Sequence, residues 1–290
     1  MPTLNASQAT IHCQRALTSA GIGEARLEAE LLVGEAVGRR REWLFLHPDE
    51  QLTDDQIARV ECMLARRLNR EPLPYILGRA EFYGLTFRIT PAAIVPRPET
   101  EILVEAAVER ARAIGAELAV DVGAGSGAIA VTLAKQLPQV RVMAIDVSLD
   151  ALRLTRENSE RQGVADRVHP VRSDLLGGIR GEFDCIVANL PYIPTQEFPS
   201  LQAEVREHEP RAALDGGDDG LALIRRLSVQ LLGHLRTRGF AALEVGAGQA
   251  GEVTKLLEAG GLSGLEVLRD YAGIERVVLG VTPGGRLPRR

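Results

Sequence analysis

The stretch AVDVGAGSGAIAV, residues 119–131, joins an apolar run to a run with helical periodicity through a glycine-rich turn. Its pattern is an Asp followed by three glycines at every second position, namely Asp121, Gly123, Gly125 and Gly127. Ala124 and Ser126 lie between the glycines. Glycines permit a sharp turn and let backbone N–H groups approach a ligand closely. The spacing is not the GxGxxG of dinucleotide-binding proteins, and no Lys-Ser/Thr pair follows as in a P-loop. The stretch therefore predicts a strand, a ligand-binding turn and a helix.

Strand-like runs alternate with helix-like runs from Glu99 onward. The predicted strands are 117–122, 140–146, 168–174, 183–189, 239–245, 264–270 and 276–281. The predicted helices are 126–136, 148–162, 199–205, 220–236 and 247–258. Such alternation predicts an α/β fold, a mostly parallel seven-stranded sheet with helices on both faces. Because the last two strands are close in sequence, they are expected to be antiparallel at one edge.

The first 75 residues show helical periodicity without strand signals, so they predict a small helical bundle with a helix starting after Thr53. Residues 71–100 are rich in proline, glycine and aromatic residues, and they predict a β-hairpin around Gly84. The expected organisation is a helical domain at 1–75, a hairpin linker at 76–98, a catalytic domain at 99–282 and a tail at 283–290.

Composition narrows the class of protein. The chain has 290 residues and a net charge of −5. A protein that binds nucleic acid mainly through its phosphates usually carries an excess of basic residues. No apolar run approaches the roughly 20 residues that span a bilayer. The three cysteines, Cys13, Cys62 and Cys185, are far apart and form no metal-ligand pattern. We therefore expect a cytoplasmic protein without a disulfide framework, a metal site, membrane attachment or stable nucleic-acid binding.

Two further predicted strands end in acidic residues. Asp146 ends the second strand, where a carboxylate can accept hydrogen bonds from ribose hydroxyls, although a lone Asp there can also cap a helix and Ser148 competes for that role. Asp174 ends the third strand and Leu175 follows it. The acidic glycine turn resembles motif I of S-adenosylmethionine-dependent methyltransferases, so all three strand ends are expected to border that cofactor.

The stretch VANLPYIP, residues 187–194, ends the fourth predicted strand, beside the glycine turn in a doubly wound sheet. Asn189 offers an amide oxygen, and the backbone carbonyl of Leu190 is a second acceptor directed by the rigid Pro191. Two acceptors can hold both hydrogens of an –NH2 group, and Tyr192 can pack on its flat face. The alternative is an ordinary turn. The Asn-Pro-Pro-Tyr pattern is typical of methyltransferases acting on planar amino groups, namely adenine N6 or glutamine N5.

Four further stretches decide between these substrates: GRAEFYGLTFRI, IVPRPETEILVE, EPRAALDGGDDGL and ALEVGAGQAGEV. They resemble the HemK/PrmC family of peptide chain release factor N5-glutamine methyltransferases, over about residues 74–279. The resemblance implies S-adenosylmethionine as cofactor, bordered by the turn residues 121–127, Asp146, Asp174, Leu175 and Asn189. It also implies that residues 189–192 bind the substrate, with Asn189, Pro191 and Tyr192 as catalytic positions.

The implied substrate is the glutamine in the Gly-Gly-Gln loop of class I release factors, and the implied role of the N-terminal helices is substrate recognition. Leu190 departs from the family, which usually has Pro at this position. Rival hypotheses are a glutamine methyltransferase for a ribosomal protein, an adenine methyltransferase for DNA or RNA, and a non-catalytic module. The last is disfavoured because the glycine turn is intact.

Overall fold

The computed structural model describes residues 4–284, which form two compact units. The first contains residues 4–78 together with Gln202–His208, and the second contains residues 79–201 and 209–284. Residues 285–290 of the predicted tail lie outside the described part. Across residues 4–284, no helix has the length and apolar character needed to cross a membrane.

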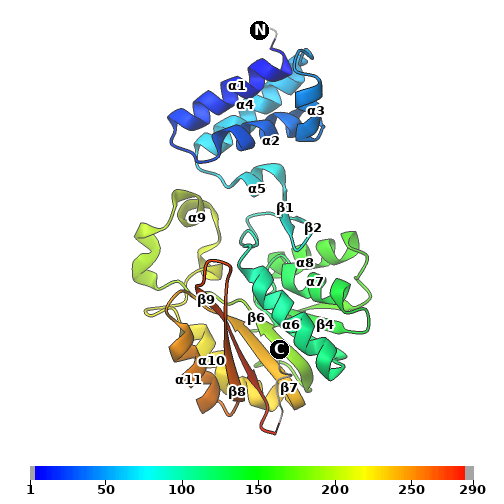
Figure 1. The fold of residues 1–290 in the computed structure, drawn as a ribbon, viewed down its shortest axis with the longest axis vertical. Helices are drawn as coiled ribbons and strands as arrows, with labels where there is room; N and C mark the ends of the chain where they lie inside the picture. The colour runs from blue at the N-terminus through cyan, green and yellow to red at the C-terminus, as the bar shows by residue number, and fades with distance from the viewer. Residues whose placement is uncertain (1–3, 285–290) are drawn as a thin grey trace. The chain divides into compact units, whose positions relative to one another are not determined.

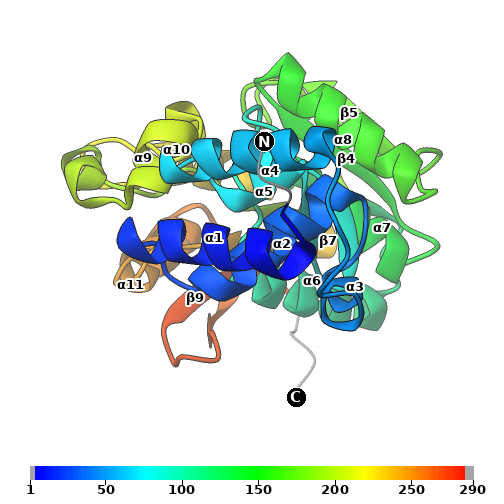
Figure 2. The same ribbon diagram turned by 90° about the horizontal axis from the view of Figure 1, so that it is seen from above.

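The first unit is a helical bundle in which α1, α2 and α4 pack together (Figures 1 and 2). Its helices are α1 (Ala6–Ser19), α2 (Ala25–Val37), α3 (Arg41–Leu46), α4 (Asp54–Leu68), α5 (Leu73–Leu77) and α9 (Ala203–His208). The predicted start at Thr53 is confirmed, because Thr53 and Gln56 form a reciprocal capping box. The core is apolar and includes Leu17, Leu32 and Val60.

One helix of the first unit, α9, comes from a distant part of the chain. Arg67 is almost fully buried and binds Glu28 through Nε at 2.6 Å and Glu204 through Nη1 at 3.1 Å. His208 Nε2 lies 2.9 Å from the backbone oxygen of Asn69. A buried guanidinium needs such partners, because leaving it unpaired costs several kcal/mol, on the order of 3–5. Residues 202–208 therefore complete the polar interior of the helical unit.

The second unit begins with the predicted hairpin, which is confirmed as antiparallel β1 (Arg79–Phe82) and β2 (Leu85–Arg88). Its turn residues Tyr83 and Gly84 both have positive φ, 52° and 71°, as two-residue hairpin turns favour. The role of this segment as a linker between domains stays a prediction.

The main sheet has seven strands in the order β5-β4-β3-β6-β7-β9-β8, as Figure 1 shows in part. Their bounds are β3 (Leu118–Val122), β4 (Arg141–Asp146), β5 (Val168–Arg172), β6 (Phe183–Ala188), β7 (Leu235–Glu244), β8 (Ser263–Arg269) and β9 (Glu275–Val281). The first five strands in chain order are parallel, and β9 is antiparallel to both β7 and β8. The predicted sheet and its antiparallel edge are confirmed.

Helices cover both faces of this sheet. On one face lie α6 (Thr100–Ile114), α7 (Ala128–Gln136) and α8 (Leu149–Arg161), and on the other lie α10 (Ala222–Leu231) and α11 (Ala250–Ala259), visible in Figure 1. Short 3-10 turns are η1 (Thr195–Ser200), η2 (Arg211–Ala213) and η3 (Leu232–His234). Two predicted helices differ from those observed. The helix expected at 199–205 is η1 followed by α9, because Pro199 cannot donate a helical hydrogen bond. The helix expected at 220–236 ends at Leu231.

Candidate active site

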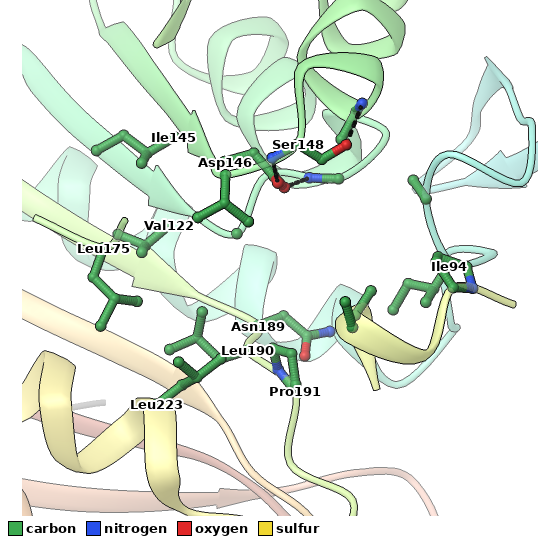
Figure 3. Close-up of a pocket in the computed structure, with 18 of the residues that line it drawn as sticks. Ile94, Val122, Ile145, Asp146, Ser148, Leu175, Asn189, Leu190, Pro191 and Leu223 are labelled. Carbon is green, nitrogen blue, oxygen red and sulfur yellow. Dashed lines mark hydrogen bonds between the residues drawn. The ribbon is translucent and has the colours of Figure 1, made fainter. Parts of the chain in front are cut away.

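A cavity of about 280 Å³ lies at the carboxyl ends of β3, β4 and β6. Figure 3 shows Asp146 and Ser148 on one side of it and Asn189, Leu190 and Pro191 on the other. This is the edge of an open parallel sheet where ligands usually bind. Its lining is mostly apolar, with a few polar groups, which is typical of a site for an organic ligand.

The glycine turn closes tightly on the ends of two neighbouring strands. The backbone N–H groups of Gly123 and Ala124 both donate to the carbonyl oxygen of Ile145, at 2.8 and 2.9 Å. Gly123 has φ +81°, and a Cβ there would lie 3.1 Å from Leu190 Cδ2. The bare backbone of Gly123 therefore makes room for Leu190, which is buried against it.

The remaining turn residues differ in what they contact. Gly125 borders the cavity, whereas Ala124, Ser126 and Gly127 are not among its lining residues. Gly127 has φ +80°, and a Cβ there would lie 2.9 Å from Thr155 Cγ2 and 3.1 Å from Thr155 Cα. Gly127 thus allows α7 to begin close against α8. Cofactor contact by these three residues stays a prediction.

Asp146 lines the cavity and also organises the turn. Its Oδ2 accepts from the backbone N–H of Gly125 at 2.9 Å, and its Oδ1 accepts from that of Ser148 at 2.8 Å (Figure 3). The helix cap is Ser148 itself, whose hydroxyl oxygen accepts from the N–H of Ala151. Asp146 is therefore not the cap of α8, and each of its carboxylate oxygens keeps a further lone pair for a ligand.

Asp121 lies behind the turn rather than in the cavity. It is fully buried, and its Oδ2 accepts from the N–H of Ala130 at 3.0 Å. Its Oδ1 has no hydrogen-bond partner within the described residues. Burial, with a smaller contribution from the nearby charge of Asp146, raises the pKa of Asp121 to about 7. The carboxyl group therefore acts from beneath the turn, where it holds the first turn of α7.

Asp174 and Leu175 both line the cavity. The Asp174 carboxylate is exposed and pairs with Arg226 at 2.6 Å. Leu175 is buried and adopts φ +51°, a strained conformation for a residue with a side chain. Its placement gives the cavity an apolar wall next to an acidic group.

Asn189 follows β6 and lines the cavity. Its Nδ2 donates to the hydroxyl oxygen of Thr100 at 3.1 Å, which leaves its Oδ1 as the atom available to a ligand. Leu190 and Pro191 line the same cavity. Leu190 also packs into the core with Val122 and Leu175, so its side chain links the cavity to the interior of the sheet.

Tyr192 is not among the residues that line the cavity. Its hydroxyl donates to Glu244 Oε1 at 3.4 Å. Burial, with the nearby charge of Glu244, raises the pKa of Tyr192 to about 12, so the phenol stays protonated at neutral pH. Tyr192 thus connects the motif to the interior, and its expected stacking on a planar group stays a prediction.

Two further loops also line the cavity, one through Ala92, Ala93 and Ile94 and the other through Pro210, Ala212 and Ala213, together with Leu223. Arg97 Nη2 donates to Glu209 Oε1 at 2.5 Å and so ties these loops together. Burial raises the pKa of Glu209, whose Oε2 has no hydrogen-bond partner within residues 4–284. The PRPET and EPRAAL stretches resemble the family, but no pattern in them indicates that Arg97 pairs with Glu209.

Comparison with protein-family models gives two matches. Residues 8–78 match the PrmC N-terminal domain, and residues 98–216 match the methyltransferase small domain. A release factor glutamine methyltransferase of Geobacter sulfurreducens is 43% identical over 272 residues, covering 93% of this chain and 93% of the relative. One of Moorella thermoacetica is 43% identical over 274 residues, covering 94% of this chain and 96% of the relative.

Solved structures share the fold at low identity. The hMettl16 catalytic domain, in complex with a hairpin of the MAT2A 3′UTR, matches with a TM-score of 0.58 and 15% identity, covering 81% of this chain and 85% of that chain. A methyltransferase from Pyrococcus furiosus matches with a TM-score of 0.52 and 20% identity, covering 77% of this chain and 98% of that chain. These likenesses concern the arrangement of strands and helices alone.

Proposed function

This chain belongs to the family of release factor glutamine methyltransferases, and on that premise we propose that it methylates a glutamine side chain of a release factor. The proposed acceptor is the amide nitrogen, N5, of the glutamine in the Gly-Gly-Gln loop of class I release factors. The observation that carries the proposal is the single cavity bordered both by the glycine turn with Asp146 and by Asn189, Leu190 and Pro191. One cavity can therefore accommodate a methyl donor beside an –NH2 group.

Membership of this family implies S-adenosylmethionine, which supplies an electrophilic methyl group on a positively charged sulfur. The residues at the cavity fit that molecule. The Asp146 carboxylate suits the ribose hydroxyls, and the buried apolar face of Leu175 suits the adenine. Gly123 and Gly125 keep the turn free of side chains where the ligand passes.

The Asn189 motif has to orient the glutamine amide. An amide nitrogen is a poor nucleophile because its lone pair is delocalised, so orientation and polarisation are what a protein can contribute. We propose that Asn189 Oδ1 and the backbone carbonyl of Leu190 accept the two N–H hydrogens. As the new N–C bond forms, the bond between the methyl carbon and the sulfur would break with its electron pair left on the sulfur, and the nitrogen loses one hydrogen as a proton. We expect water to take it, because residues 189–192 include no base and the Tyr192 phenol stays protonated.

A labelling experiment tests the proposed substrate. The full chain is incubated with methyl-labelled S-adenosylmethionine and, separately, a class I release factor, a ribosomal protein preparation and adenine-containing DNA. We expect label only in the release factor, and its loss when the Gly-Gly-Gln glutamine is replaced by alanine. Label in ribosomal protein or DNA, with none in the release factor, would contradict the proposal.

The sequence-based expectations about domains and location extend the proposal. We assign substrate recognition to the helical domain expected at 1–75 and methyl transfer to the domain expected at 99–282. A cytoplasmic location agrees with the three cysteines, all of which are free thiols.

A further inference from the structure

A buried acidic residue lies behind the Asn189 motif. Glu244 ends β7 and is 2% exposed, and its Oε2 has no hydrogen-bond partner within the part of the chain described. Its sequence neighbours Leu243 and Val245 belong to the apolar core. Burying a carboxyl group without full compensation is costly, so a chain retains one for a reason other than packing.

Two hydroxyl groups next to the motif interact with this carboxyl group. The Tyr192 hydroxyl donates to Glu244 Oε1 at 3.4 Å. The Thr100 hydroxyl also interacts with this carboxyl group and lowers its pKa, as a hydroxyl that turns its hydrogen toward a carboxylate does. Thr100 also accepts from Asn189 Nδ2 at 3.1 Å. A polar path therefore runs from the cavity to the interior, from Asn189 through Thr100 to Glu244.

The order of donors and acceptors along this path determines which end of the Asn189 amide, the oxygen or the –NH2 group, faces the cavity. A hydroxyl has one hydrogen to donate. When Thr100 gives that hydrogen to Glu244, it can only accept from Asn189, so the –NH2 side of the amide must face Thr100. The amide oxygen then faces the cavity. The reversed amide would present –NH2 to the –NH2 of a substrate, and neither group could accept from the other.

We propose that Glu244 is a positioning residue that acts through Thr100 to hold the Asn189 amide with its oxygen toward the cavity. This inference rests on the proposed function, because it specifies how the Asn189 side chain is kept in the orientation that accepts a hydrogen from the substrate –NH2 group. Glu244 does not touch the substrate. It also holds Tyr192, so both ends of the Asn-Leu-Pro-Tyr segment are tied to one buried group.

The path also gives a role to two stretches that resemble the family but had no assigned role. Thr100 belongs to IVPRPETEILVE, and Glu244 belongs to ALEVGAGQAGEV. In the second stretch, Gln249 Nε2 donates to the backbone oxygen of Tyr192 at 2.9 Å, while its Oε1 accepts from the N–H of Gly246 at 2.8 Å. Two segments far apart in sequence thus converge on the back of the motif.

The ionisation of Glu244 provides a signature. Burial raises its pKa to about 7, a rise that Thr100, Arg276 and Tyr192 oppose and Glu99 adds to. Once protonated, Glu244 no longer requires the Thr100 hydrogen, and Thr100 is free to donate to the oxygen of a reversed Asn189 amide. The accepting orientation is therefore enforced as the pH rises through about 7.

Kinetics of four variants test the proposal with the full chain, labelled S-adenosylmethionine and release factor. Thr100→Val removes the hydroxyl at nearly constant shape, and Glu244→Gln removes the charge. Each is expected to lower kcat about 10- to 100-fold with little change in the KM for S-adenosylmethionine. Thr100→Ser restores the hydroxyl and should recover most of the loss. The double variant should be little worse than either single one, because both break the same path.

A second measurement needs no substrate and separates this inference from the proposed function. In the full chain labelled with nitrogen-15, the Asn189 side-chain amide signal, assigned with Asn189→Ala, should shift with pH around a midpoint near 7. Glu244→Gln and Thr100→Val should remove that shift. A flat signal in the wild type, or the same titration in Glu244→Gln, would overturn the inference. Failure to label release factor with this titration intact would count against the proposed function alone.

Discussion

The two sides of the cavity satisfy their polar groups in different ways. At the ends of β3 and β4, Asp146 accepts from two backbone N–H groups, that of Ser148 two residues further on and that of Gly125 in the glycine turn, 21 residues away in sequence. At the end of β6, Asn189 depends on Thr100, which lies 89 residues away in sequence. The first side is completed by backbone groups of the two loops that form it, and the second is completed by a side chain that the fold brings from a more distant segment.

This difference affects tolerance to substitution. A turn held by backbone groups keeps its shape as long as its glycines remain, so changes there should act on cofactor binding or on folding. A side chain held by a remote network can lose its orientation while the fold and cofactor binding persist. Substitutions on the two sides should therefore have different kinetic effects. Those at the end of β6 should lower turnover, and those at the end of β4 should lower the affinity for the cofactor.

Asn189→Ala should have the largest effect. It removes the proposed acceptor for the substrate N–H, and loss of one group of this kind typically costs about 100- to 1,000-fold in kcat. Binding of S-adenosylhomocysteine, measured by calorimetry, should change little because Asp146 and the turn remain. Near-normal turnover would refute the role of Asn189, and lost cofactor binding would remove the proposed division between the two sides.

Gly127→Ala should destabilise the fold. Positive φ costs a non-glycine residue about 1–2 kcal/mol, and contact of the new Cβ with Thr155 should add about 1–3 kcal/mol. Gly163→Ala is the matched control, since Gly163 has φ +67° but no atom within 4 Å of a Cβ. The difference between the two variants in the free energy of unfolding, measured in urea, reports the crowding alone. Equal losses would show that α7 and α8 adjust freely.

Asp146→Asn should raise the KM for S-adenosylmethionine about tenfold and leave kcat nearly unchanged, because one charge-assisted hydrogen bond to the ligand becomes weaker. Asp150→Asn is the control, because Asp150 is an exposed carboxylate near the start of α8, the helix that follows Asp146, and is not among the residues lining the cavity. A drop in kcat without a rise in KM would place Asp146 with the catalytic group instead.

The smallest effect expected is on the pH dependence of stability. Since burial raises the pKa of Asp121 from 3.8 to about 7, the folded state holds this proton more tightly than the unfolded state does. The stabilisation is complete below about pH 4 and is lost as the pH rises to about 7. Asp121→Asn should flatten this decline in Tm, although Glu244 contributes a similar one. An unchanged slope would mean that Asp121 is ionised throughout.

The order of strands and helices could be predicted because each strand carries its own apolar run and each turn its own glycine or polar signal. Boundaries were less certain. The strand expected at 239–245 begins at Leu235, because Phe183 pairs with Leu235 across a register shift and Arg238 takes φ +71° before Gly239. No local pattern indicates such a bulge, since pairing with β6 determines it.

The residues of the site could likewise be predicted only in part. Residues at the strand ends could be predicted because parallel strands place their carboxyl ends at one edge of the sheet. Which of these residues face the cavity depends on the direction of each side chain, and so Asp146 lines it while Asp121 lies beneath it. The proposed path through Asn189, Thr100 and Glu244 joins three distant segments, and no sequence pattern around Thr100 or Glu244 indicates that they meet the Asn189 side chain.

The helical unit is discontinuous along the chain, because α9 belongs to it while the residues on either side of α9 do not. A gene fragment encoding residues 1–78 would therefore be an incomplete module. Its Arg67 would keep Glu28 but lose Glu204, and Asn69 would lose the imidazole of His208. Exchange of the helical unit, to which we assign substrate recognition, between relatives would accordingly require two segments, the N-terminal helices and the stretch around 202–208.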